Sequence, residues 1–227
     1  MSTERPAGRP ARATLSVVDD EVPRRLRAER ERRQISLREL ARRLGVSPSA
    51  ISQIETGRAR PSVATLWAIV TELGMSLDDL FAEEDRPGGE ARAEAPAGQA
   101  RATPVLGEAA REAIRLATGV RWERLTAEPD PDVDFIFVTY EVGGSSSPDD
   151  ALVRHAGREY GLVLTGELEV TVGFERSVLG PRDSISFAST TPHRLRNVGD
   201  VPVTGVWVVV GRRSEPSAGP PQPGGAP

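Results

Sequence analysis

The sequence predicts two domains, an all-α domain of five helices followed by an all-β domain of the barrel or sandwich type. Over residues 22–82, apolar side chains recur at helical spacing between residues that start and stop helices. Over residues 105–211, short β-rich runs alternate with Gly, Pro and Asp, and eight of the ten aromatic residues lie there. A chain of 227 residues is long enough for two ordinary domains.

Three further segments lack either pattern. Residues 1–21 are rich in Pro, Arg, Ala and Ser, and we expect them to form a disordered tail. Residues 83–104 contain Pro, Gly and Ala but no large apolar residue, which predicts a flexible linker. Residues 212–227 are dominated by Pro and Gly and predict a second disordered tail.

The composition excludes several classes of protein. The chain has no cysteine, which excludes disulfides and thiolate metal ligands. No apolar run approaches the ~20 residues that a bilayer span requires, so we expect no membrane partner. The arginines near the N-terminus are not followed by an apolar segment, unlike those of a secretion signal. The expected location is the cytoplasm.

Charge is distributed unevenly along the chain. Residues 22–60 hold eleven arginines and four glutamates, a net charge of +7, and the remainder of the chain carries −11. A basic block attached to an acidic remainder is typical of a local DNA-binding surface. A solvated helix face produces the same pattern, so charge alone leaves both interpretations open.

Helix starts in the first domain are marked by proline or capping residues. Ser36 and Glu39 form an S-x-x-E capping box for a helix over 37–44, and a glycine at 45 ends that helix. Ser47 followed by Pro48 opens the next helix, over 48–55. The other predicted starts are Pro23 for the first helix, Ser62 for the fourth, and Ser76 with Asp79 for a short fifth helix ending near Phe81.

Two short helices joined by Gly45, Val46 and Ser47 match the helix-turn-helix arrangement. An arbitrary helical bundle needs similar caps, and what separates the two is the string SLRELARRLGVSPSAISQIETGRARPSVATLWAIVTELGMSLDDLF. From about Leu26 to Phe81 it closely resembles the repressor/Cro-type domain of the xenobiotic-response-element family. Ala-x-x-Leu-Gly-Val-Ser, Ile-Ser-Gln-Ile-Glu-x-Gly and the following Pro-Ser match that family in order and spacing.

The resemblance implies that the helix over 48–55 enters the major groove of DNA. Its exposed side chains Ser49, Ser52 and Gln53 would then meet base edges, and a glutamine can donate and accept together on adenine. Other contacts would set the register on phosphates without reading sequence, although each arginine among them has solvation as an alternative. These expected contacts are Ser36, Arg38, Ser47, Arg58 and Arg60.

Glu55 has a different predicted role. It lies at the C-terminal end of the recognition helix, where the helix dipole disfavours an acid. In the family that this domain resembles, the matching position pairs with an arginine of the first helix, which is Arg30 here. We therefore expect a positioning salt bridge between Arg30 and Glu55, not a base contact.

The second domain contains six clear strand candidates, over residues 135–142, 159–165, 167–173, 184–189, 193–199 and 203–211. Thr165, Gly166 and Glu167 predict a hairpin between the second and third of them. The string RHAGREYGLVLTGELEVTVG, followed by LGPRDSISFASTTPHRLRNVG and VWVVV, resembles the cupin fold, a double-stranded β-helix barrel. That resemblance implies an early strand over about 113–117, where local propensity alone favours a helix.

The cupin resemblance also implies a site inside the barrel. In the first cupin motif His155 and Glu159 match ligand positions, whereas Val153 replaces the other histidine. In the second motif His193 and Asn197 match, whereas the preceding Pro and Gly are absent. Both histidines of the chain thus fall on ligand positions.

Two imidazoles and a carboxylate can hold Fe(II), Mn, Ni or Zn with open positions. A metal-free polar pocket made by the same residues is the alternative, so the cofactor is left open between one divalent metal and none. Tyr160, Phe187 and Asn197 are the expected further pocket residues, although aromatic residues more often belong to the core.

A helix-turn-helix domain followed by a cupin resembles a known group of bacterial regulators. It implies a sequence-specific transcription regulator, more often a repressor, whose barrel binds a small-molecule effector and supports dimerisation. The expected partner is a palindromic operator with half-sites roughly 34 Å apart, bound by a homodimer. Two alternatives stay open: a metal-dependent cupin enzyme with a DNA-binding appendage, and a barrel that serves as a dimerisation module only.

Overall fold

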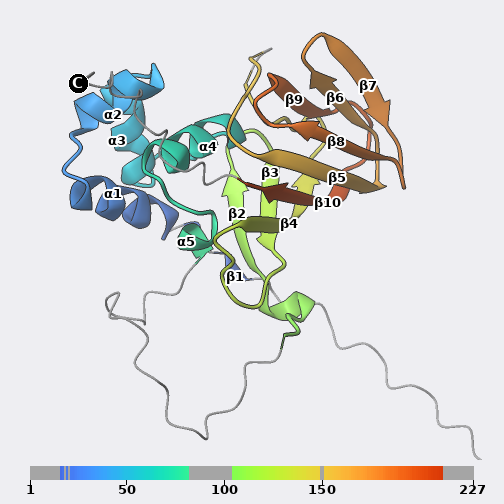
Figure 1. Cartoon of the computed structure of the whole chain (residues 1–227), viewed down its shortest axis with the longest axis horizontal. Coiled ribbons are helices and arrows are strands. Elements are labelled where there is room, and N and C mark those ends of the chain that lie inside the picture. The colour runs from blue at the N-terminus through green and yellow to red at the C-terminus, as the bar shows by residue number, and fades with distance from the viewer. Residues whose placement is uncertain (1–15, 18, 20, 82–103, 149–150, 212–227) are drawn as a thin grey trace, which may run out of the picture.

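The computed structural model describes residues 16, 17, 19, 21–81, 104–148 and 151–211. Its N-terminal part confirms the five-helix domain, and Figure 1 shows these helices gathered beside the strands. The helices are α1 (Val22–Arg32), α2 (Leu37–Leu44), α3 (Pro48–Glu55), α4 (Val63–Glu72) and α5 (Asp78–Phe81).

The predicted caps are confirmed and fix the turn between α2 and α3. The Oγ of Ser36 accepts a hydrogen bond from the Glu39 amide, and the Oγ of Ser47 accepts one from the Ala50 amide, both at 3.1 Å. Gly45 ends α2 with a φ of +67°, a left-handed conformation that side chains with a Cβ rarely adopt. The chain therefore turns sharply from α2 into α3.

A buried ion pair joins α1 to α3. The Nε of Arg30 lies 2.7 Å from Oε1 of Glu55, and its Nη2 lies 2.9 Å from Oε2. The third nitrogen of Arg30 donates to the carbonyl of Ile35 at 2.8 Å, in the loop that leads into α2. The hydrogen bond with Glu55 raises the pKa of Arg30 above its ordinary value. One guanidinium thus fixes the position of α3 against both neighbouring segments.

The second domain consists of two antiparallel sheets that face each other, with a short β1 (Ser16–Val17) added in parallel at one edge. The larger sheet has the order β1-β2-β3-β4-β10-β5-β8 and the smaller has the order β7-β6-β9. The strands are β2 (Glu112–Leu116), β3 (Val120–Arg124), β4 (Val133–Tyr140), β5 (Arg158–Thr165), β6 (Leu168–Val172), β7 (Glu175–Leu179), β8 (Ser184–Ala188), β9 (His193–Asn197) and β10 (Val203–Val210).

Alternation of buried and exposed residues along β5 and β10 decides which of their side chains enter the barrel. In β10, Trp207 and Val209 are buried whereas Val206 and Val208 are half-exposed. Because successive side chains of a strand point to opposite faces, each central strand contributes one inward row and one outward row. Gly161 of β5 faces Trp207 in register, and a Cβ there would lie 2.2 Å from the indole ring, so this position leaves room for Trp207.

The strand predictions need three corrections. The predicted hairpin at Gly166 is wrong, because this turn carries the chain from β5 in one sheet to β6 in the other. Strand β7 was not predicted, since its residues are mostly exposed and carry no apolar alternation. Strand β3 was not predicted either. By contrast, the strand expected near 113–117 is confirmed as β2, which pairs with β3 despite its helical propensity.

The predicted N-terminal tail is wrong for its last part. Residues 16 and 17 form β1 against β2, and Asp19 accepts a hydrogen bond from the Arg115 amide at 2.8 Å. An edge strand offers unpaired backbone groups to any nearby segment, and the local composition of the tail cannot reveal that partner. Residues 1–15, residues 83–103 of the linker predicted over 83–104, and the predicted tail at 212–227 lie outside the described residues.

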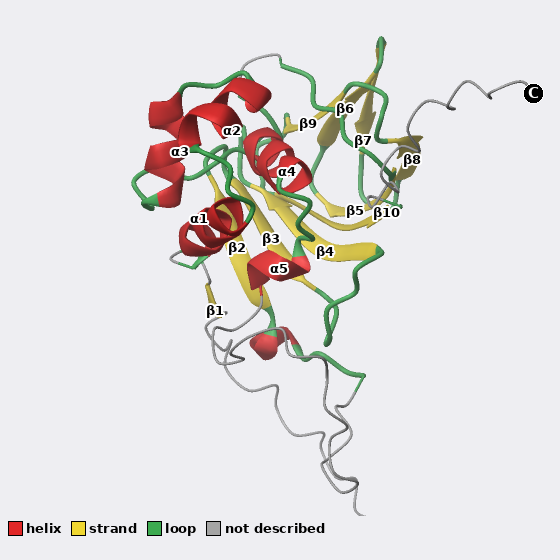
Figure 2. Cartoon of the chain, turned by 60° about the vertical axis from the view of Figure 1, so that its left-hand side comes forward, coloured by secondary structure: helices red, strands yellow, loops and turns green. Residues whose placement is uncertain are grey.

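The helical domain packs directly against the barrel. Figures 1 and 2 both place α4 and α5 next to strands β2, β3 and β4. The Ala64 amide donates to the carbonyl of Ser146 at 2.9 Å, and the Ala117 amide donates to the carbonyl of Pro61 at 2.9 Å. A single hydrophobic cluster continues from the helices into the barrel. The two domains therefore share one packed interface.

Candidate functional site

Among the described residues, one face of α3 does not pack against the hydrophobic core. Ser49 and Gln53 are exposed and Ser52 is half-buried, whereas Ile51 and Ile54 on the opposite side are buried. Nε2 of Gln53 lies 3.4 Å from Oγ of Ser49, which is a long hydrogen bond between two side chains of this face. The predicted base-reading residues therefore lie together on a surface that can enter a groove.

The predicted phosphate contacts do not all have the same surroundings. Ser36 and Ser47 are exposed at the N-termini of α2 and α3, where backbone amides favour an anion. Arg38 and Arg58 are exposed, and no ion pair within the described ranges includes either of them. Arg60 differs, because its Nη2 lies 3.0 Å from Asp19.

Many other arginines of the helical domain form ion pairs with glutamates. Glu39 pairs with both Arg42 and Arg43 at 2.7 Å, and these hydrogen bonds lower the pKa of Glu39 to about 2. Glu29 pairs in the same way with Arg32 and Arg33 at 2.6 Å. Each of these glutamates offsets the charge of one arginine, so the net positive charge of the helical domain is smaller than its arginine count suggests.

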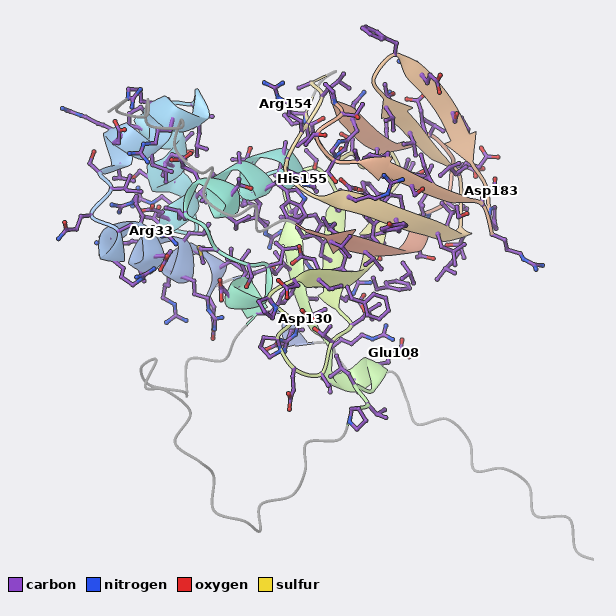
Figure 3. The ribbon with its side chains drawn as sticks, viewed as in Figure 1. Arg33, Glu108, Asp130, Arg154, His155 and Asp183 are labelled. Carbon is purple, nitrogen blue, oxygen red and sulfur yellow. The ribbon has the colours of Figure 1, made fainter. Side chains whose placement is uncertain are left out.

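Inside the barrel, His155, Glu159 and His193 form a buried cluster of potential ligands. His155 lies just before β5, Glu159 is on β5 and His193 begins β9. Oε1 of Glu159 lies 3.0 Å from Nε2 of His155 and 3.2 Å from Nε2 of His193. Figure 3 shows His155 between α4 and the strands, beside the exposed Arg154.

The outer nitrogens of both imidazoles are held by backbone carbonyls. Nδ1 of His155 lies 2.9 Å from the carbonyl of Ala156, and Nδ1 of His193 lies 2.9 Å from the carbonyl of Thr191. A carbonyl oxygen only accepts, so each Nδ1 carries the hydrogen. In a neutral imidazole the lone pair then lies on Nε2, and both Nε2 atoms point at Oε1 of Glu159. This arrangement is stable only with positive charge among the three atoms, either protons or a metal cation.

The electrostatics of Glu159 agree with such a site. Burial raises the pKa of Glu159, but the hydrogen bonds and charges of His155 and His193 outweigh burial and hold the pKa below its ordinary value. Its Oε2 accepts a hydrogen bond from the Trp207 indole at 2.8 Å, whereas its Oε1 faces the Nε2 atoms of His155 and His193. The carboxylate is thus oriented by Trp207 and presents one oxygen inward, as a metal-ligating carboxylate does.

A cavity of about 20 Å³ adjoins the three side chains. Its walls are mostly apolar and include Trp122, Tyr140 and Trp207 from the barrel. A cavity needs roughly 10–15 Å³ to hold one water molecule, so this one has room for a water or a metal ion.

None of the three further pocket residues predicted from the sequence lines the cavity. Tyr160 is 45% exposed on the outer face of β5, because its neighbour Glu159 points inward. Asn197 is buried, but its side chain bonds the backbone of Tyr140, Val201 and Gly199 and so fixes a turn. Phe187 does pack against the His193 ring, with ring centroids 4.9 Å apart.

Two wall residues from the helical domain, Val63 and Trp67 of α4, were not predicted from the sequence. Leu66, Ile69 and Val70 of the same helix are also buried. A signal was present, since α4 is apolar around most of its circumference, which indicates burial on two sides.

Comparison with known proteins agrees with this architecture. Residues 26–80 match the helix-turn-helix family and residues 136–209 match the cupin domain family. The HTH-type transcriptional regulator PuuR of Escherichia coli is 26% identical over 176 residues, which cover 77% of this chain and 86% of PuuR. SutR of Escherichia coli, another HTH-type transcriptional regulator, is 24% identical with the same coverage.

A solved structure shares the whole fold. The crystal structure of a helix-turn-helix family transcriptional regulator from Vibrio cholerae has a TM-score of 0.59 and 21% identity, and it covers 86% of this chain and 98% of its own. Within the described residues, no helix is both long and apolar enough to cross a membrane. The chain belongs to the helix-turn-helix transcription regulators that carry a C-terminal cupin domain.

Proposed function

We propose that this regulator is a repressor that binds a palindromic operator as a homodimer, and that its barrel senses a small molecule without catalysing a reaction. The observation that carries the proposal is the free face of α3, on which Ser49, Ser52 and Gln53 lie together. Arg38 on α2 and Arg58 just after α3 are exposed and can bind phosphates. A protein that acts on chromosomal DNA works in the cytoplasm of a bacterium.

The buried cluster supports the sensing role. His155, Glu159 and His193 fit a divalent metal, since three lone-pair atoms converge and Trp207 orients the carboxylate. A metal bound there would supply a Lewis-acidic position for an oxygen or nitrogen donor of an effector. Val153 stands where the fourth ligand of the family would be, which leaves room for that donor.

Catalysis is the second candidate, because two histidines and one carboxylate are also the ligand set of non-haem iron oxygenases. The two Escherichia coli relatives are regulators by name, which favours sensing. A turnover that disappears in His155→Ala would establish the enzyme instead.

The outer face of the large sheet supports the dimer. In register, Val208 lies between Phe135 and Tyr160, and Val206 lies between Phe137 and Leu162. All of these side chains are exposed or half-exposed. A continuous apolar face of this kind marks an interaction surface, and a second copy can match it row by row about a two-fold axis. Two copies are also what a two-half-site operator requires.

Gln53→Ala should weaken binding to a cognate operator by about 1–3 kcal/mol, because one base contact is lost. Binding to random duplex at low salt should stay the same, since phosphate contacts supply it. The measurement is a pair of fluorescence-anisotropy titrations, with an operator selected from a random DNA pool and with unselected duplex. Thr71→Ala, on the exposed side of α4, is the control. Equal losses on both duplexes would contradict base reading by Gln53.

Elemental analysis of the full chain should find about one divalent ion per molecule, and Glu159→Gln should abolish it. Trp207→Phe removes only the outer hydrogen bond to Glu159, so metal affinity should fall roughly 10–100-fold. Val153→His should raise metal affinity, because it restores a fourth ligand. The exposed Glu167→Gln serves as the control. Wild-type protein that takes up no ion would refute the metal site.

Leu162→Asp should convert the dimer to a monomer, because it places a charge in the middle of the apolar face. Light scattering coupled to size-exclusion chromatography measures the mass directly. Phe174→Asp, at the fully exposed turn between β6 and β7, is the matched control and should leave the dimer intact. A Leu162→Asp dimer, or a monomeric wild-type protein, would exclude this interface.

A further inference from the structure

The sensing cavity is closed by a residue of the DNA-binding domain. Trp67 of α4 is 4% exposed, and its ring is stacked on the imidazole of His155, with centroids 4.5 Å apart and planes 14° from parallel. It also meets Trp122 edge-to-face at 5.7 Å. Val63, one turn earlier on α4, lines the same cavity. One wall of the barrel site is thus supplied by a helix outside the barrel.

The same helix is tied to the DNA-reading helices. Leu66, Ile69 and Leu73 of α4 are fully buried in the helical core. Glu72 at the end of α4 pairs with Arg43 of α2 at 2.7 Å, and α2 leads directly into α3. A displacement of α4 away from the barrel therefore moves α2 and α3 with it. This is a short mechanical path from the cavity to the DNA-binding face.

The size of the cavity makes that displacement necessary for most ligands. Its volume of about 20 Å³ has room for a water or a metal ion and little more. The walls that the barrel contributes include Trp122, Tyr140 and Trp207, and strand pairing holds these three in place. Trp67 is the one aromatic wall that a movement between domains can remove.

We propose that Trp67 is the contact through which the DNA-binding domain detects the contents of the barrel. The regulator's effector is a small molecule with an apolar body and one oxygen donor, which reaches the His155–Glu159–His193 cluster only when Trp67 and α4 leave the barrel. The ring that covers His155 is then replaced by the ligand, and the two domains separate. This inference rests on the proposed sensing function and adds the means by which sensing reaches DNA.

Hydrogen exchange at two backbone amides reports whether α4 stays packed against the barrel. The Ala64 amide bonds Ser146 across the interface and the Ala117 amide bonds Pro61, so both exchange slowly while α4 stays on the barrel. Benzoate is a suitable probe of the proposed chemical class, and cobalt(II) in the metal site reports its arrival through visible absorption bands. The test combines benzoate titration of the cobalt-loaded full chain with hydrogen exchange at these two amides.

In wild type, benzoate should shift the cobalt bands and raise exchange at both amides together. Trp67→Ala should bind benzoate about tenfold more tightly, because the free-energy cost of opening is removed, and its two amides should exchange fast before benzoate is added. Trp67→Phe keeps a smaller ring over His155 and should fall between the two. Thr71→Ala, on the outer side of α4, should behave as wild type.

Three results would overturn the inference. Benzoate could bind while both amides stay protected, or it could bind Trp67→Ala no more tightly than wild type. The third is that benzoate shifts the cobalt absorption bands of neither wild type nor Trp67→Ala. Failure of cobalt to bind at all would instead refute the proposed metal site. In that case the exchange rates of Trp67→Ala and Trp67→Phe without ligand still decide whether Trp67 seats α4. Failure of the ligand-free wild type to bind any operator would refute the DNA-binding function alone.

Discussion

The burial of α4 on two sides is the constraint on which the rest of this structure depends. One side completes the core of the helical domain, and the other closes the barrel through Val63 and Trp67. A helix that is apolar around most of its circumference must be covered by two partners. Here the partners are a DNA-binding domain and a cupin barrel, so the packing that stabilises the chain also connects the DNA-binding domain to the barrel that we propose as its sensor.

Contacts between charged or polar side chains hold the residues of each site in position. The bidentate pair of Arg30 and Glu55 orients α3 and leaves its opposite face to DNA. In the barrel, His155, Glu159 and His193 bring three acceptors together, and their repulsion is relieved only by a proton or a cation. The ring of His155 is stacked on Trp67 of α4, so the cluster is in van der Waals contact with the helical domain.

Much of this could be predicted from the sequence because the signals are local. Capping residues at 36, 45 and 47 specify the helix-turn-helix, and the family resemblance supplies the pairing of Arg30 with Glu55. The two histidines and Glu159 matched ligand positions, and the structure brings them together. The wrong prediction that Tyr160 lines the pocket could have been avoided, because a strand that turns Glu159 inward must turn the neighbouring side chain outward.

The remainder depends on contacts between distant segments. Strand β1 forms because β2 has a free edge, which no pattern in residues 16–19 reveals. The role of Asn197 arises from carbonyls more than 50 residues away. Trp67 reads as an ordinary apolar residue until the barrel is placed against α4. Position in three dimensions, not residue type, gives these residues their function.

The distance between the two domains tests the shared role of α4 most directly. Because the chain has no cysteine, the exposed positions Arg27 and Phe174 can be replaced by cysteine and spin-labelled. Pulsed electron–electron double resonance on the zinc-loaded double variant should give one narrow distribution of distances between the two labels. When benzoate fills the cavity, this distribution should become broader and move to longer distances. A distance distribution that stays narrow and unchanged with the cavity filled would contradict the account.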